Sequence, residues 1–462
     1  DEQQPYADDE SQIQEANSPS HPVALARYRP RDEHRERDEQ DHPKQNTLEI
    51  HALMPANPLI TPSPSKSEKL GLSRLVLNKD HERTRAFDIL KDQRLNLFVN
   101  TGSDADRQFI RDLSLEKGEE AQLPMEGHTI HFDLKEEQGR IIDRTYYFTN
   151  PDDLVSSLAN KVDRAEALED IRRKMVGIMA GKIMIVGFYM RGPVGAPVSN
   201  PALEITSSTY VSHSAEILYR NAFSDFNDQV ERLGHYYTNI HSEGLNRPED
   251  LPSARVYMDR SYQTTYSINC TYAGNTLLLK KGNHRFSVDK AVYDARGTEL
   301  SEHMFVTGID GPGGRITWLT GAAPSGCGKT TTAMAGNHFV GDDLAQLWID
   351  DGGSVRAVNP ECGIFGIVED VNLEGDPLLM ACLRQPGTEV IWSNVLIDEN
   401  GLPQWVGNGE EMPRKGINFQ GPWEQGMTDE NGKPVPVSHP NSRCTLSSSA
   451  LANYSEAAED PQ

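Results

Sequence analysis

A glycine-rich segment followed by a lysine and threonines predicts that this chain binds phosphate. The segment covers residues 321–332 and directly follows the apolar stretch 315–320. Backbone N–H groups of such a turn can hold phosphate oxygens, and the helix that follows adds its positive end. Lys329 is expected to reach the β- and γ-phosphates and Thr330 to place its hydroxyl on Mg²⁺. Ala323 stands where the usual pattern has glycine, so a plain strand-to-helix connection is the alternative.

Two adjacent carboxylates follow the next apolar stretch, and they are candidates for a cation site. Asp342 and Asp343 end the segment 339–343. Carboxylates beyond a strand end that face a phosphate loop are typical cation ligands. A solvated turn is the alternative interpretation, and the nearby phosphate loop favours the cation site.

These candidates need particular elements to position them. The predicted order is strand 304–308, strand 315–320, glycine loop, short helix and strand 339–341, which is typical of an α/β nucleotide-binding domain. Upstream, the continuous apolar run 182–190 predicts a buried strand. Apolar spacing predicts helices over two ranges, residues 104–115 and residues 151–175.

The composition is that of a soluble globular protein and excludes several function classes. The chain has 462 residues, 37% of them hydrophobic, which allows two or three domains. Its formal net charge of −24 argues against a nucleic-acid binder, which needs a basic surface. Five cysteines without paired spacing predict a reducing, cytoplasmic setting and no zinc site or disulfide framework. The apolar run 175–190 is too short and too mixed to cross a bilayer, so no membrane contact is expected.

Taken together, these motifs resemble the GTP-using phosphoenolpyruvate carboxykinases. The loop 324–330 has Cys327 in its middle, as in the GTP-using type, whereas the ATP-using type has threonine there. The ATP-using type also has glycine at the position of Ala323, as the usual phosphate-loop pattern requires. Further segments resemble the family in the same order, over roughly residues 140–443. These segments are residues 188–197, 272–281, 302–304, 359–366 and 439–443.

The resemblance implies a fold and three regions. The expected fold class is α/β, with an N-terminal α/β domain followed by a P-loop nucleotide-binding domain of the carboxykinase type. Residues 1–80 are expected to be a disordered polar tail, 81–298 the substrate-binding domain, and 299–462 the nucleotide- and metal-binding domain. The family continues beyond this point with a guanine pocket and a lid, so the chain is expected to be C-terminally truncated.

The resemblance also implies a metal site with an unusual ligand. Lys281, His303 and Asp343 would bind Mn²⁺, while Asp342 and Thr330 would serve the Mg²⁺ that accompanies GTP. A lysine can ligate a metal only as the neutral amine, so burial must depress the pKa of Lys281 by several units. Without the resemblance, Lys280 and Lys281 would be interpreted as a solvated pair and His303 as a core histidine.

Substrate and nucleotide residues follow from the same resemblance. The residues implied for oxaloacetate and phosphoenolpyruvate are Arg140, Tyr272, Ala273, Gly274, Ser325, Asn441, Ser442 and Arg443. Those implied for the nucleotide are Gly326, Cys327, Gly328, Lys329, Thr330 and Thr331, although the GTP-using type usually has asparagine at the position of Thr331. Cys327, Arg443 and Lys329 are the implied catalytic residues, with Cys327 shaping a mobile loop. Arg144 is a rival for the role of Arg140.

The implied reaction converts oxaloacetate and GTP into phosphoenolpyruvate, GDP and CO₂, as in gluconeogenesis, in a cytoplasmic monomer. Two alternatives stay open. A generic P-loop kinase or NTPase would keep Lys329, Thr330 and both aspartates, but it gives no reason for Lys281, His303 or the segment 439–443. An inactive, truncated carboxykinase would bind only metal and nucleotide.

Overall fold

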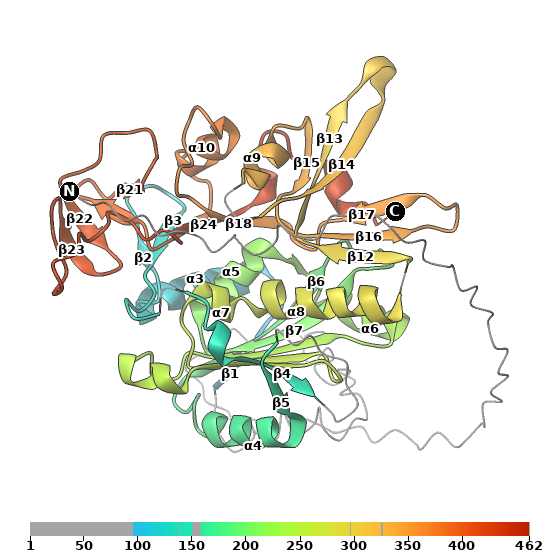
Figure 1. The fold of residues 1–462 in the computed structure, drawn as a ribbon, viewed down its shortest axis with the longest axis horizontal. Coiled ribbons are helices and arrows are strands. Elements are labelled where there is room, and N and C mark those ends of the chain that lie inside the picture. The colour runs from blue at the N-terminus through green and yellow to red at the C-terminus, as the bar shows by residue number, and fades with distance from the viewer. Residues whose placement is uncertain (1–95, 138, 150–158, 296, 325–326, 462) are drawn as a thin grey trace, which may run out of the picture. The chain divides into compact units, whose positions relative to one another are not determined.

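Figure 1 shows the fold of the computed structural model, which combines helices with mixed sheets as the sequence predicts. The described residues are 96–137, 139–149, 159–295, 297–324 and 327–461. The predicted disordered tail, residues 1–80, lies outside these ranges. Within them, no helix has the length and apolar character needed to span a membrane.

The largest sheet in the described part of the chain has nine strands. Eight of them follow the order β1-β6-β7-β9-β11-β10-β4-β5, and β8 pairs with β6. Their bounds are β1 Asn96–Asn100, β4 Thr145–Thr149, β5 Lys161–Asp163, β6 Ile183–Arg191, β7 Asn200–Thr206, β8 Arg220–Asn221, β9 Tyr237–Ser242, β10 Arg255–Asp259 and β11 Thr264–Ile268. The buried strand predicted over residues 182–190 is confirmed as β6, in which every residue after Ile183 is buried.

Helices pack on both faces of this sheet, because successive strand residues point to opposite sides. On β6, Val186, Phe188 and Met190 share a hydrophobic cluster with α4, whereas Tyr189 shares one with α5 and α8. Figure 1 shows α4 below the sheet and α5 and α8 above it. The helices of this region are α3 Asp104–Lys117, α4 Arg164–Met175, α5 Thr209–Leu218, α6 Phe226–Leu233, α7 Ala273–Thr276 and α8 Leu278–Asp289.

One predicted helix is confirmed and the other is shorter than predicted. The helix expected over residues 104–115 is α3. The helix expected over 151–175 begins only at Arg164, and Asp163 ends the strand β5 before it. The Asp163 carboxylate accepts hydrogen bonds from the backbone N–H groups of Ala165 and Glu166, which fixes the start of α4 at this point. Residues 151–158 lie outside the described ranges.

The second half of the chain contributes smaller sheets. Here β13 pairs antiparallel with both β14 and β15, so the predicted order of strand, loop, helix and strand is confirmed with β13 between the two strands. The elements are β12 Glu299–Glu302, β13 Met304–Asp310, β14 Ile316–Ala322, α9 Lys329–Met334, β15 His338–Gly341, β16 Ala345–Ile349, β17 Val355–Val358, β18 Gly363–Ile367, α10 Pro377–Leu383, β19 Val390–Ser393, β20 Leu396–Asp398, β21 Pro403–Gln404, β22 Lys415–Asn418, β23 Gly421–Glu424 and β24 Arg443–Ser447.

An early segment of the chain completes a sheet of the second half. The order in this sheet is β18-β24-β19-β3-β2, where β2 is Ala121–Gln122 and β3 is His128–His131. β3 runs parallel to β19, and the Trp392 indole donates to His128 Nδ1 at 3.0 Å in the buried interior. The two halves therefore share main-chain hydrogen bonds as well as side-chain contacts.

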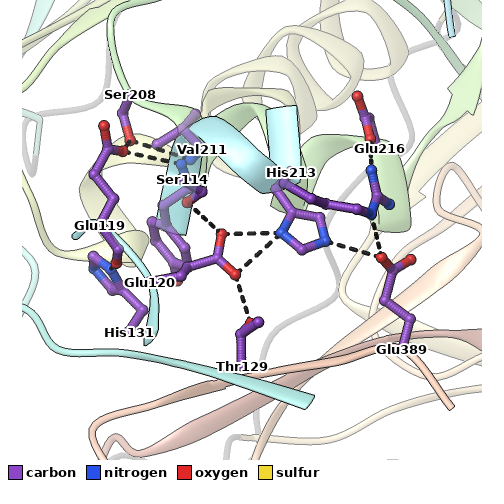
Figure 2. A network of polar contacts seen from close by, with 12 residues as sticks. Ser114, Glu119, Glu120, Thr129, His131, Ser208, Val211, His213, Glu216 and Glu389 are labelled. Carbon is purple, nitrogen blue, oxygen red and sulfur yellow. Dashed lines mark hydrogen bonds and ion pairs between the residues drawn. The ribbon is translucent and has the colours of Figure 1, made fainter. Parts of the chain in front are cut away.

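Near this shared sheet, a buried histidine lies between two glutamates (Figure 2). His213 on α5 places Nδ1 2.9 Å from Glu120 Oε1 and Nε2 3.1 Å from Glu389 Oε1. Arg111 on α3 also contacts Glu389, at 2.5 Å, and Glu216, at 2.6 Å. Burial acts to lower the pKa of His213, but its contacts with Glu120 and Glu389 outweigh this effect and raise the pKa to about 9. The raised pKa favours the charged form of the histidine at neutral pH, and its contacts connect α5 with the residues directly before β2 and β19.

We expect this histidine to make stability depend on pH. Because the pKa of His213 is higher in the folded chain, its contribution is complete below the unfolded value of about 6.5 and is lost as the pH rises through about 9. The loss should be about 3 kcal/mol in the free energy of unfolding, measured by urea denaturation at each pH. His213→Gln should flatten this dependence. His338→Gln, which removes a histidine paired with the exposed Asp310, should not. Equal slopes for the parent and His213→Gln would contradict the assignment.

Candidate active site

The predicted phosphate loop joins β14 to α9. Ser325 and Gly326 lie outside the described residues, and Cys327 is exposed. Gly328 has a φ of +76°, a left-handed conformation that favours glycine, and it caps α9 directly before Lys329. The strand, glycine turn and helix start that the sequence predicts are therefore present around this loop.

Side chains at the start of α9 contact the two aspartates that follow β15. Lys329 Nζ lies 2.8 Å from Asp343 Oδ1. Thr330 Oγ1 donates to Asp342 Oδ2, also at 2.8 Å. The structure thus brings together four residues that the sequence assigns to phosphate and cation binding.

The adjacent carboxylates have opposite pKa shifts. Burial raises the pKa of Asp342 to about 6, and the neighbouring charge of Asp343 adds to this effect. Burial acts in the same direction on Asp343, but the Lys280 cation and a hydrogen bond with His303 lower its pKa well below the usual value. Asp343 is therefore ionised and suited to direct metal ligation, whereas Thr330 holds Asp342 through its hydroxyl.

The surroundings of Lys281 favour the neutral form of its amine. It lies on α8 and is partly buried. Burial lowers its pKa well below the usual value, and the positive charges of Arg140 and Lys280 lower it further. Among the described residues, no hydrogen bond or ion pair engages its Nζ atom. A lowered pKa favours the neutral amine, the form whose free lone pair metal ligation requires.

His303 completes the predicted donor set. It lies between β12 and β13, and its Nδ1 is 3.4 Å from Asp343 Oδ1. Its ring packs edge to face against His284, with 4.6 Å between centroids. In the described ranges, no three His, Cys, Asp or Glu side chains form a metal site, so a site here depends on the amine of Lys281. An amine, an imidazole and a carboxylate are donor groups that suit a divalent metal ion.

The predicted substrate residue Arg140 lies on a loop that Asn275 attaches to α7. Asn275 Nδ2 donates to the carbonyl of Gly139 at 3.1 Å, and its Oδ1 accepts from the N–H of Ile141 at 3.2 Å. The Arg140 side chain is exposed, and its charge acts on Lys281. These contacts place Arg140 beside the predicted metal ligand.

Arg144, the alternative to Arg140, and the segment before α8 differ from Arg140 in their contacts and burial. Arg144 donates to the carbonyl of Leu251, away from the contacts of Arg140. Tyr272 and Ala273 are buried, with 3% and 2% exposure. A Cβ atom at Gly274 would lie 2.4 Å from Cε1 of Tyr272, so the close approach of the ring requires glycine.

The segment 439–443 places Arg443 at the start of β24. Its guanidinium lies 4.6 Å from the Phe365 ring centroid, and Nη1 donates to the Phe365 carbonyl at 3.3 Å. The positive charge of Arg443 also acts on Lys281. Ser442 is fully buried, and the backbone N–H of Asn441 donates to His439 Nδ1 at 2.9 Å. Arg443 is thus the member of this segment that reaches the charged cluster.

The contacts of several residues at the site are not predicted from the sequence. Thr331 donates to Asp376 Oδ1 at 2.6 Å, and nothing in the sequence marks this aspartate as a partner. Lys280, interpreted from the sequence alone as a solvated residue, is only 2% exposed and lies 2.9 Å from Asp343. Asn275 belongs to the segment that resembles the family, but its contact with the Arg140 loop depends on tertiary structure.

Comparison with known protein families gives two matches that together cover most of the chain. Residues 91–292 match the phosphoenolpyruvate carboxykinase N-terminal domain. Residues 299–462 match the phosphoenolpyruvate carboxykinase C-terminal P-loop domain. Both matches name one family, and they lie in the order expected from the sequence.

Individual relatives agree with these matches. "Phosphoenolpyruvate carboxykinase [GTP]" of Pyrococcus abyssi is 40% identical over 374 residues, covering 79% of this chain and 59% of the relative. The protein of the same name from Saccharolobus solfataricus is 39% identical over 366 residues, covering 79% of this chain and 57% of the relative. The one from Anaeromyxobacter dehalogenans is 28% identical over 379 residues, covering 78% and 60%. The chain therefore spans somewhat more than half the length of these curated relatives.

Proposed function

The chain belongs to the GTP-type phosphoenolpyruvate carboxykinase family, and from this membership we propose that it converts oxaloacetate and GTP into phosphoenolpyruvate, GDP and CO₂. The observation that carries the proposal is the convergence of Lys281, His303 and Asp343 beside Lys329. A generic P-loop kinase needs the lysine of the loop but has no use for a second lysine held as a neutral amine.

In the proposed reaction, three side chains hold Mn²⁺, and two others serve the Mg²⁺ of the nucleotide. Lys281, His303 and Asp343 are the Mn²⁺ ligands, and Asp342 and Thr330 face the nucleotide's cation. The bound divalent cation supplies charge stabilisation to the enolate oxygen and to the transferring phosphoryl group. The pKa shifts of both residues favour the forms that ligation requires, the carboxylate of Asp343 and the neutral amine of Lys281.

The remaining residues position the reactants and offset their charge. Arg140 and Arg443 are suited to the carboxylate and phosphate groups of oxaloacetate and phosphoenolpyruvate, because a guanidinium can bond two oxygens at once. Asn275 supports Arg140 by holding its loop. Tyr272 and Gly274 complete the proposed substrate set with Ala273, Ser325, Asn441 and Ser442. Oxaloacetate first loses CO₂ to leave an enolate, whose oxygen attacks the γ-phosphorus of GTP while GDP leaves.

The nucleotide is proposed to bind along the loop before α9. Backbone N–H groups from Gly326 to Gly328 would hold phosphate oxygens, and Thr331 would complete this set. Lys329 would leave Asp343 to contact the β- and γ-phosphates, where its charge stabilises the transfer. No residue forms a covalent intermediate in this scheme. Cys327 therefore acts through the shape of the loop and not as a nucleophile.

The assignment is tested by measuring phosphoenolpyruvate formation from oxaloacetate with Mn²⁺ and with GTP, ITP or ATP. We expect phosphoenolpyruvate to form with GTP and with ITP but not with ATP. The rate of its formation should rise with the concentration of added Mn²⁺. Hydrolysis of the nucleotide without phosphoenolpyruvate would leave the generic P-loop enzyme in its place. Binding of Mn²⁺ and GTP without turnover would identify this chain as a binding-competent but inactive carboxykinase.

We extend the proposal to the organisation of the chain. The substrate-binding region is assigned to residues 81–298 and the nucleotide-binding region to residues 299–462, with support from the family matches at 91–292 and 299–462. A cytoplasmic location is consistent with the five cysteines, all of which are free thiols. A monomeric state completes this proposal and can be measured by light scattering.

A further inference from the structure

A second lysine at the proposed metal site is buried in an ion-pair network. Lys280 is 2% exposed, and its Nζ lies 2.9 Å from Asp343 Oδ2. The same Nζ lies 2.8 Å and 2.6 Å from the two carboxylate oxygens of Glu361, which is 1% exposed. Tyr219 donates its hydroxyl to Glu361 Oε1 at 3.0 Å. None of the roles implied for the metal ligands requires Glu361.

The helix α8 explains why two consecutive lysines have different surroundings. Successive residues of an α-helix point about 100° apart, so neighbours face different partners. Lys280 faces two carboxylates and forms ion pairs with Asp343 at 2.9 Å and Glu361 at 2.6 Å. Among the described residues, the Nζ atom of Lys281 forms no hydrogen bond or ion pair.

Glu361 reaches Lys280 from the connection between β17 and β18. Its backbone N–H donates to Asn359 Oδ1 at 3.0 Å, which fixes the turn, and Asn359 in turn donates to the Val340 carbonyl at 3.3 Å. Val340 belongs to β15, the strand that leads to the two aspartates. The same local structure therefore holds Glu361 and the strand that leads to Asp343.

The charges in this network bear directly on metal binding. A buried ammonium group 2.9 Å from one oxygen of Asp343 would repel a divalent cation bound at the same carboxylate. Because Glu361 lies even closer to that ammonium group, its charge cancels the repulsion while Lys280 still holds Asp343 Oδ2. Asp343 Oδ1 is left facing His303 and Lys329.

We propose that Glu361 is a positioning residue for the metal site, which acts through Lys280 by neutralising its charge and holding it against Asp343. This inference rests on the proposed function, because it takes Asp343 as a ligand of Mn²⁺. It differs from a purely structural role in one respect. Loss of Glu361 alone leaves Lys280 with Asp343, the proposed metal ligand, as its carboxylate partner, so that its charge opposes the metal, whereas loss of both charges does not.

The decisive experiment measures Mn²⁺ binding to the protein alone, by calorimetry and by electron paramagnetic resonance. Glu361→Gln keeps the size of the side chain and an acceptor for Tyr219. It should weaken Mn²⁺ binding about tenfold or more, because Lys280 is then left with Asp343 as its carboxylate partner and its charge competes with the metal for that carboxylate. Lys280→Met/Glu361→Gln removes both charges and should recover most of that loss. Glu399→Gln, at an exposed position, should bind Mn²⁺ as the parent does.

Two results would overturn the proposal: parent-like Mn²⁺ affinity in folded Glu361→Gln, or a double variant that binds no better than the single one. If Glu361→Gln does not fold, Glu361→Asp and the double variant test the proposal instead. In both variants, the number of positive charges at position 280 equals the number of negative charges at position 361. Each should bind within about threefold of the parent, and a tenfold loss in either would contradict a role through charge. A parent that binds no Mn²⁺ at all would count against the proposed metal site itself.

Discussion

Lys281→Ala should abolish Mn²⁺-dependent phosphoenolpyruvate formation, with a loss of roughly 10³-fold in rate, or about 4 kcal/mol of barrier. The physical reason is that Lys281 supplies one of three donors and that its pKa is already lowered by burial and by Arg140. The remaining pair, His303 and Asp343, cannot hold the cation in a fixed geometry. Activity assays and Mn²⁺ titration should show the two losses together.

A charge-preserving control separates ligation from electrostatics. Lys281→Arg keeps a positive side chain, but a guanidinium does not lose its proton and cannot offer a lone pair. This variant should therefore fail as completely as Lys281→Ala. Lys433→Ala, at an exposed position, should leave both Mn²⁺ binding and turnover unchanged. Substantial activity in Lys281→Arg would exclude the lysine as a metal ligand.

Lys329→Gln should reduce turnover by about 10² to 10³-fold while leaving Mn²⁺ binding intact, because a group that stabilises the transferring phosphate acts mainly in the transition state. The lysine contacts Asp343 Oδ1 at 2.8 Å. Its removal therefore leaves that oxygen more available, and Mn²⁺ affinity should stay the same or increase. Steady-state kinetics combined with the Mn²⁺ titration would measure both quantities.

The contrast between the two lysine variants is the sharper test. Both substitutions remove one amine within reach of Asp343, but only Lys281 is placed among the metal ligands. Lys433→Gln serves as the matched control for a lysine at an exposed position. If Lys329→Gln lost Mn²⁺ binding as Lys281→Ala should, the division of roles between the two would be wrong.

The sequence predicts those parts of the fold that depend on local pattern. A continuous apolar run predicts β6, and a glycine-rich segment predicts the turn between β14 and α9. Both elements form where expected. The sequence predicts a start of α4 that is too early, because the apolar spacing continues upstream of Arg164. The helix begins where Asp163 caps it. The start of α4 thus depends on a single polar side chain, and the spacing of apolar residues gives no information about it.

The site is predictable only as far as resemblance extends. Composition and spacing give no reason to choose Lys281 over Lys280, since the two are adjacent and chemically identical. Their difference arises from tertiary structure: Lys280 finds its carboxylate partner 81 positions away, whereas Lys281 finds only positive neighbours and one aspartate. The role inferred for Glu361 could not be predicted from sequence for the same reason.

The parallel pairing of β3 with β19 also constrains the order in which the chain can fold. The partners His128 and Trp392 are 264 positions apart, so β3 leaves the ribosome long before its neighbour exists. Closing so long a loop is costly in chain entropy, and contacts of this range slow folding. Until β19 is synthesised, β3 keeps a free edge that other chains can pair with. The strand that unites the two halves is therefore also a site at which the nascent protein is exposed to aggregation until synthesis is complete.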